Sequence, residues 1–149
     1  MKADFAKHFT GGALRNLKKV KTRRVKYDEN SITFTLKSKV GKYNLGKFEC
    51  VYDIRYNDDG RYDYDFCIMR SMNYPDRCVP HPHIQDMIPC FGSFFIPIKD
   101  ALESGEIDEV VNLTQRFLNH QSHDIFATAR EIVEEAYCPD CGLFNECEC

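Results

Sequence analysis

The residues best suited to chemistry lie in one proline-rich stretch, VPHPHIQDMIPCFG, at positions 79–92. Two histidines, His81 and His83, flank a proline, and Cys90 follows the second histidine by seven residues. A thiol becomes a strong nucleophile when a nearby imidazole takes its proton or stabilises its thiolate. The stretch predicts a catalytic thiol with histidine helpers, part of a metal site, or a simple turn on the way into a helix.

Three interpretations of Cys90 stay open at this point. It can be a small buried apolar side chain, because free cysteines are often buried. It can be a nucleophile, which needs an exposed and electropositive position, or it can be a metal ligand. We expect His81 to hold the loop through hydrogen bonds, whereas His83 is the candidate for proton transfer beside the thiol. A buried Cys90 would exclude the nucleophile.

The C-terminal stretch CPDCGLFNECEC carries a second group of candidate residues, and these are metal ligands: Cys138, Cys141, Cys147 and Cys149. A C-x-x-C pair followed by glycine can point two thiolates at one ion, and a C-x-C pair follows. Four thiolates suit tetrahedral Zn²⁺. The loop between the pairs is much shorter than the roughly 15–20 residues of a common zinc ribbon. A redox dithiol at Cys138 and Cys141, or a site completed by another chain, stays open as an alternative.

The chain has 149 residues and a formal net charge of −3, which fits one domain with no overall preference for nucleic acid. Its charge is uneven, because the stretch Arg15–Lys26 is rich in Lys and Arg and contains no acidic residue. Such a run is most often a solvated face. Contact with nucleic acid through Arg15–Lys26 is a weaker alternative.

No stretch has the roughly 18 consecutive apolar residues that a membrane-spanning helix needs. The first residues, MKADFAKHFTGG, lack the apolar core of a signal peptide. We therefore expect no membrane partner and a cytoplasmic location, in a host cytoplasm or a virion if the chain is viral. The 8 cysteines then point to metal or thiol chemistry more than to disulfides.

The elements that must position the thiol begin with strands. Apolar and polar residues alternate over Ser31–Ser38 and again from Phe48 to Tyr56, which predicts two half-buried strands. NDDG at Asn57–Gly60 predicts a hairpin turn, and Arg61–Ser71 the returning strand. The inward face of that third strand is expected to carry Tyr62, Tyr64, Phe66 and Ile68.

Helices are expected after the proline-rich coil of residues 73–92. A short helix follows Cys90, the sequence SGEID at Ser104–Asp108 ends it, and a longer helix carries Val110, Leu113 and Phe117 on one face. A last helix is predicted over His123–Tyr137, capped by Ser122 or Asp124. Strands first and helices last predict an α+β fold, an antiparallel β-meander with helices packed on one face.

This order of elements, together with HPH at His81–His83 and Cys90 nine residues after His81, resembles the ubiquitin-conjugating enzymes and their UBC-like relatives. HPH lies where that family carries His-Pro-Asn, and Cys90 lies near the place of its catalytic cysteine. FLNHQSHDIF at Phe117–Phe126 is similar to the segment that joins two of the family's helices. The resemblance covers roughly Ser31–Tyr137, and its pattern is closest to bacterial and phage members.

We expect three parts: a basic N-terminal segment at 1–30, the UBC-like domain that the resemblance implies at 31–137, and a zinc-knuckle tail at 138–149. The resemblance also implies that Cys90 could carry a ubiquitin-like protein as a thioester, with His81 structural. His83 replaces the family's asparagine, and Phe91 and Gly92 replace its polar residue after the cysteine. We therefore expect a protein-interaction or assembly module with no or vestigial transfer activity, and keep the thioester-carrying enzyme as the alternative. In both cases the partner is another protein, a ubiquitin-like carrier or an assembly subunit.

The tail gives the first testable prediction. Purified protein is expected to contain about one zinc per chain by elemental analysis, because four clustered thiolates in a reducing compartment favour that ion. Replacing Cys138 and Cys141 by serine should release the metal and expose the other two thiols to titration. A metal content well below one per chain, with all four thiols freely titratable, would reject the zinc site.

Overall fold

A computed structural model describes residues 25–27, 31–53, 66–121 and 125–134 of the chain. Its centre is an antiparallel sheet with the strand order β1-β2-β3-β4. The strands are β1 (Lys26–Tyr27), β2 (Ser31–Val40), β3 (Tyr43–Asp53) and β4 (Cys67–Ser71). Consecutive strands are neighbours, so the predicted antiparallel meander is confirmed.

The period-two pattern determines which side of the sheet faces the core. Ile32, Phe34 and Leu36 of β2 are almost fully buried, while the residues between them are more exposed. They lie in register with Tyr52, Cys50 and Phe48 of β3, which are also buried. These three cross-strand pairs form the floor of the core, as the alternation predicts.

The third strand differs from the prediction in its inward face. Ile68, expected to face the core, is 41% exposed, whereas Cys67 and Met69 are fully buried. Phe66 is buried as predicted, but it lies in a bend just before β4. Phe66 and Cys67 are consecutive and both buried, so the alternation restarts at Cys67. From there on, each side chain of β4 lies on the side of the sheet opposite to the predicted one. The turn Asn57–Gly60 and the residues up to position 65 lie outside the described residues.

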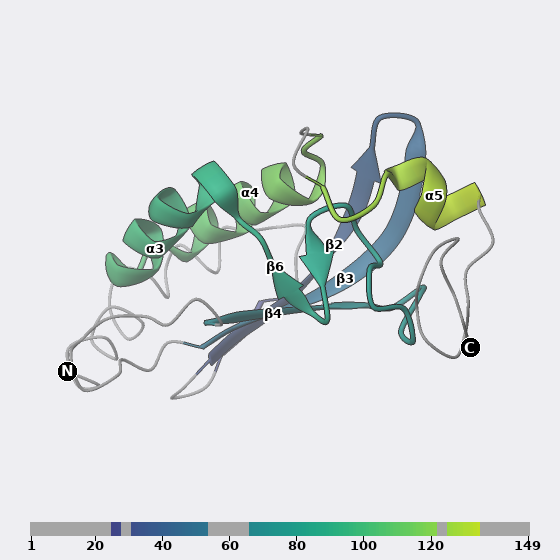
Figure 1. Ribbon diagram of the computed structural model, residues 1–149. Helices are drawn as coiled ribbons and strands as arrows, with labels where there is room; N and C mark the ends of the chain where they lie inside the picture. The colour runs from purple at the N-terminus through teal and green to yellow at the C-terminus, as the bar shows by residue number, and fades with distance from the viewer. Residues whose placement is uncertain (1–24, 28–30, 54–65, 122–124, 135–149) are drawn as a thin grey trace.

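The helices follow the proline-rich stretch and lie on one side of the sheet (Figure 1). A 3₁₀ turn, η1 (Gly92–Phe94), leads into α3 (Phe95–Glu103) and α4 (Ile107–Leu118). The break between α3 and α4 falls within Ser104–Asp108, as predicted. Asp108 and Glu109 lie in the first turn of α4 and Arg116 in its last turn, both favourable to the helix dipole. The apolar stripe of α4 packs on β2.

The last helix begins later than predicted. The structure has α5 (Ala129–Glu134), and Thr128 rather than Ser122 or Asp124 precedes it. The Thr128 hydroxyl accepts a hydrogen bond from the Glu131 backbone N–H at 3.1 Å, which caps the first turn. Ile125, which falls within the predicted helix, lies before the observed one and is 37% exposed.

A hydrogen bond holds the irregular segment before α5. The Phe126 backbone N–H donates to the Pro82 carbonyl at 2.8 Å, so this segment is tied to the HPH loop instead of continuing the helix. Residues 135–137 of the predicted helix and the zinc-knuckle tail lie outside the described residues. Of the stretch Arg15–Lys26, the structure describes Val25 and Lys26, and Lys26 opens β1.

A buried hydrogen-bond chain links the sheet to the helical layer and gives the second prediction. The Tyr52 hydroxyl lies 2.7 Å from the Thr114 hydroxyl, which donates to the Val110 carbonyl at 2.6 Å. Since Thr114 uses its proton for Val110, Tyr52 donates to Thr114. Replacing Tyr52 by Phe should lower the free energy of unfolding by about 1 kcal/mol, measured by urea denaturation. The matched change Tyr43→Phe, at a half-buried site, should cost less; an equal loss in both would contradict the assignment.

Candidate functional site

The loop that carries the predicted site is a small, braced hairpin. Its strands are β5 (Ile84–Gln85) and β6 (Ile88–Pro89), which pair antiparallel, so the stretch predicted as coil contains a short piece of regular structure. Asp86 and Met87 both have positive φ, at 51° and 66°, the conformation of a tight two-residue hairpin turn. The Met87 carbonyl accepts a hydrogen bond from the Met69 N–H at 2.9 Å, which fastens the hairpin to β4.

His81 holds this loop to the end of α4. Its ring is fully buried, with Nδ1 accepting the His83 backbone N–H at 3.0 Å. Since Nδ1 accepts, the proton sits on Nε2, which donates to the Leu118 carbonyl at 2.8 Å. Burial lowers the pKa of His81 to about 4, so the ring is neutral at physiological pH. These contacts match the predicted role of loop holding.

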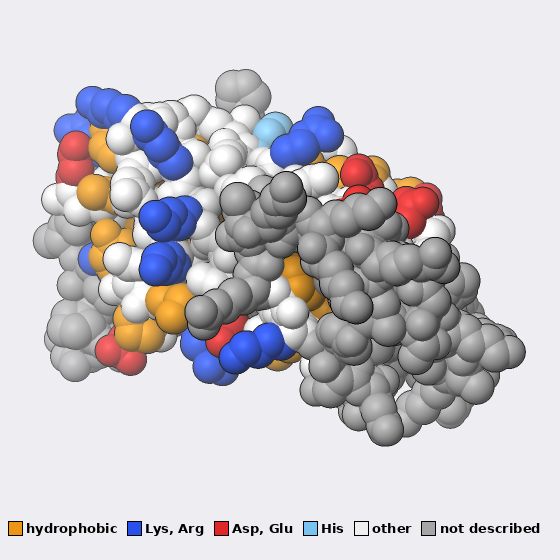
Figure 2. All heavy atoms as spheres, turned by 180° about the vertical axis from the view of Figure 1, so that it is seen from behind, with side chains coloured by type: hydrophobic (Ala, Val, Ile, Leu, Met, Phe, Trp, Pro, Cys, Tyr) orange, Lys and Arg blue, Asp and Glu red, His pale blue; other side chains and the backbone are white. Residues whose placement is uncertain are grey.

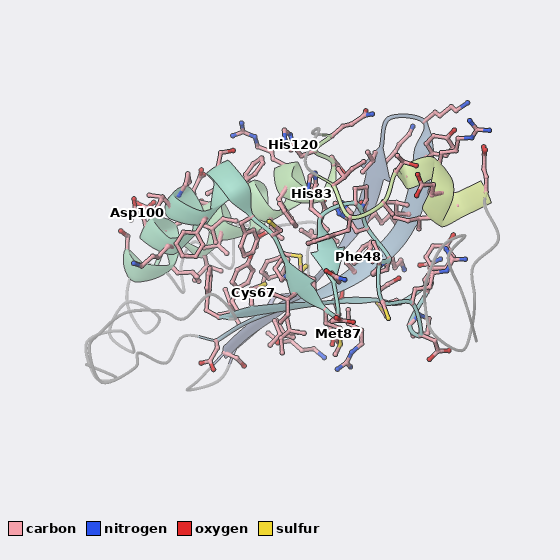
Figure 3. The ribbon with its side chains drawn as sticks, viewed as in Figure 1. Phe48, Cys67, His83, Met87, Asp100 and His120 are labelled. Atoms are coloured by element: carbon pink, nitrogen blue, oxygen red, sulfur yellow. The ribbon has the colours of Figure 1, made fainter. Side chains whose placement is uncertain are left out.

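His83 lies one residue beyond the proline and connects the loop backbone to Cys90. The His83 carbonyl accepts the Cys90 backbone N–H at 2.8 Å, which fixes the cysteine relative to the HPH turn. The His83 side chain is only 5% exposed. Its ring stacks on that of His120, with centroids 5.9 Å apart, at the end of α4 (Figure 3).

Cys90 is exposed, whereas Cys50 and Cys67 are fully buried and Cys78 is half-buried. Burial raises the pKa of the Cys50 and Cys67 thiols, which keeps them protonated. The interpretation of Cys90 as a small buried core residue is therefore wrong. Among the four cysteines that the structure describes, Cys90 is the one best placed to meet a reagent from solution.

Two hollows meet at Cys90. One has a volume of about 480 Å³ and a mostly apolar lining that includes Ile88, Phe95 and Phe126. The other, about 240 Å³, is lined by His83, Ser93, His120 and the Phe94 and Phe117 rings. Cys90, Phe91 and Gly92 line both. The thiol thus lies between an apolar surface and a surface that carries two imidazoles.

His120 is the site residue that the sequence analysis missed. It is exposed, it stands two residues after the end of α4, and its ring meets the Phe94 ring edge-on at 5.3 Å. Its spacing of three residues from Phe117 places both on one side of the helix end, which is a signal present in the sequence. The contact with His83 joins residues 37 positions apart, and no local pattern indicates such a pairing.

The metal-ligand interpretation of Cys90 gains no support from its surroundings. Within the described ranges, no group of three or more His, Cys, Asp or Glu side chains could hold an ion. The predicted ligands Cys138, Cys141, Cys147 and Cys149 all lie beyond residue 134, outside the described residues.

In the described part of the chain, no helix has both the length and the apolar character for crossing a bilayer.

Comparisons with protein-family models, with curated proteins and with solved structures found no match to this chain. The fold and the geometry around Cys90 are therefore the observations on which a function can be argued.

The buried ring of His81 gives the third prediction, a pH dependence of stability. The unfolded chain binds a proton at this residue near pH 6.5, but the folded chain binds it only near pH 4. Stability from this group is therefore fully present above pH 6.5 and falls as the pH drops toward 4, by up to roughly 3 kcal/mol. Urea unfolding at a series of pH values measures the slope.

Two variants separate His81 from the other groups that titrate in this range. His81→Gln should be less stable at pH 7.5, because the loop contacts are lost, but its stability should depend less on pH between 6.5 and 4. His120→Gln, which changes an exposed histidine of the same site, serves as the matched variant for the loss of one imidazole. Equal slopes in the original protein and His81→Gln would contradict the prediction.

Proposed function

We propose that this chain is a UBC-like acyl-transfer protein in which Cys90 carries the C-terminal acyl group of a ubiquitin-like protein as a thioester. The observation that carries the proposal is the exposure of Cys90 at the meeting point of two hollows, on a loop braced by His81. A nucleophile in group transfer must be open to its substrate and yet held on a rigid scaffold. Cys50 and Cys67, buried in the core strands, are closed to a substrate.

The proposed reaction has two balanced steps. The Cys90 thiolate attacks the carbonyl carbon of an incoming thioester, and the tetrahedral oxyanion collapses to expel the donor's thiolate. An amine then attacks the new thioester, loses its proton to a base, and the Cys90 thiolate leaves. No electrons are gained or lost overall, so neither step needs a redox partner.

The two hollows suit different partners in this reaction. The apolar hollow offers Ile88, Phe95 and Phe126 to the acyl chain and its adjoining residues. The hollow with His83 and His120 offers imidazoles to the amine. Imidazole can take up a proton near neutral pH, and its N–H can donate to an oxyanion. His83 is nearly buried, so His120 is the more accessible proton acceptor.

A second candidate function is a protein-interaction or assembly module in which transfer chemistry is absent. The observation that favours it is the set of large exposed apolar side chains near the same loop: Met87 at 44%, Ile88 at 38%, Ile96 at 57% and Phe126 at 48%. Exposed apolar groups of this kind suit a protein partner whether or not a thioester forms. In either function, we propose the C-terminal cysteines as a structural zinc knuckle.

The fourth prediction tests the thioester directly. The protein is incubated with a peptide that ends in Gly-Gly and carries a C-terminal alkyl thioester, and intact mass spectrometry follows the product. The peptide should add to Cys90 through a bond that dithiothreitol cleaves, and Cys90→Ala should reduce the adduct to background. Cys78→Ala, a change at a half-buried cysteine, should leave it unchanged.

Alkylation by iodoacetamide supplies the control for accessibility. Cys90 should be modified faster than Cys50, Cys67 and Cys78, since it is the exposed thiol of the four. If Cys90 is alkylated rapidly but forms no thioester with any donor, transfer is rejected and the interaction module stands. If Cys90 resists alkylation in the folded protein, the exposure of its thiol is contradicted, and with it the candidate site.

A further inference from the structure

The outer face of the sheet, turned away from the helices, carries a concentration of positive charge. Alternation along the strands places five cationic side chains on this outer sheet face: Lys26, Lys37, Lys39, Lys47 and Arg70. The acidic side chains on the same face of β1–β4 are Glu49 and Asp53. Five positive and two negative charges give +3 here, while the whole chain carries −3. Figure 2 shows Lys and Arg side chains close together on the side seen from behind.

Two of these lysines face each other directly. Lys37 of β2 is in register with Lys47 of β3, and both are exposed. Like charges at opposed positions on neighbouring strands destabilise a sheet. Among the side chains that the structure describes, Arg70 has a carboxylate partner on this face, Glu49 at 3.8 Å, but no carboxylate lies within salt-bridge distance of Lys37, Lys39 or Lys47. An anion from outside the chain would relieve this repulsion.

Contacts from α4 and from the residue that follows it hold the backbone beneath these lysines. The Gln115 side-chain amide donates to the Lys37 carbonyl at 2.8 Å, and the Lys39 N–H donates to the Asn119 side-chain oxygen at 3.0 Å. The Lys37 carbonyl and the Lys39 N–H are therefore occupied, and an added strand cannot use them. What the face offers to a partner is its side chains, with the lysines at fixed spacings of about 5 Å across strands and about 7 Å along them.

We propose that the outer sheet face binds the phosphate backbone of a duplex nucleic acid. A duplex carries about one negative charge per 1.7 Å of its axis, a density that can engage several of these cations at once. The neutral residues among them, Thr33, Thr35, Val51 and Ile68, include hydroxyl donors for phosphate oxygens but no aromatic ring on which an unpaired base could stack. Binding is therefore to the backbone and independent of base sequence.

Lys26 connects this face to the basic stretch of the sequence. It lies in β1 and pairs with Thr33, so its side chain shares the outer face. Lys26 is also the last residue of the basic stretch Arg15–Lys26, so the stretch is joined to this face in the sequence. The proposal does not depend on Cys90, and it holds whether or not the thioester forms.

The fifth prediction measures binding of the full-length protein to a short fluorescent DNA duplex by anisotropy, over a range of salt concentrations. Replacing both Lys37 and Lys47 by Gln should weaken binding by about tenfold or more at low salt, and should flatten the slope of log affinity against log salt by roughly 2. The melting temperature of the double variant should be unchanged or higher, because two opposed like charges are removed.

A matched double variant controls for net charge. Lys99→Gln with Arg130→Gln removes the same charge from α3 and α5, in the helical layer, and should leave the salt slope as it is. Equal losses in the two double variants would overturn the proposal, because attraction would then follow net charge alone. It would also be overturned if poly-L-glutamate of equal charge displaced the duplex at equal concentration, since the surface would then suit acidic protein chains.

Discussion

The structure around the thiol depends on one buried side chain, His81, which joins segments far apart in the sequence. Its two ring nitrogens are both used, one by the loop itself through the His83 N–H and one by the carbonyl of Leu118 at the end of α4. A hydrocarbon side chain of the same size would fill the space but leave that carbonyl and that N–H without their partner. The two hydrogen bonds of His81 therefore fix the position of the cysteine loop relative to the end of α4.

Much of the sheet could be predicted from the sequence because its causes are local. Alternation in β2 and β3 follows from the pleat, and the break before α4 follows from Ser104 and Gly105. The errors have non-local causes. The inward face of β4 depends on pairing with Cys50 and Tyr52, and α5 begins late because Phe126 is hydrogen-bonded to Pro82. Neither partner can be found from the pattern of the segment itself.

The candidate site shows the same division. His81, His83 and Cys90 lie within ten residues of one another, so their proximity was predictable from spacing alone. The exposure of Cys90 was not, because it depends on how η1 and the hairpin turn the chain. His120 comes from another element and reaches the site through α4. Sequence patterns identify residues of one segment, whereas a site assembled from two segments requires the packing that brings them together.

The contacts of Gln115 and Asn119 with β2 have a consequence for the behaviour of the protein at high concentration. A bare strand edge is a template on which a second molecule can extend the sheet, and repeated extension produces fibrils. Here two amide side chains, one in α4 and one just after it, occupy backbone groups that such a neighbour would need. These two contacts make this end of β2 a poor template for a second molecule, and the side chains responsible lie outside the strand itself.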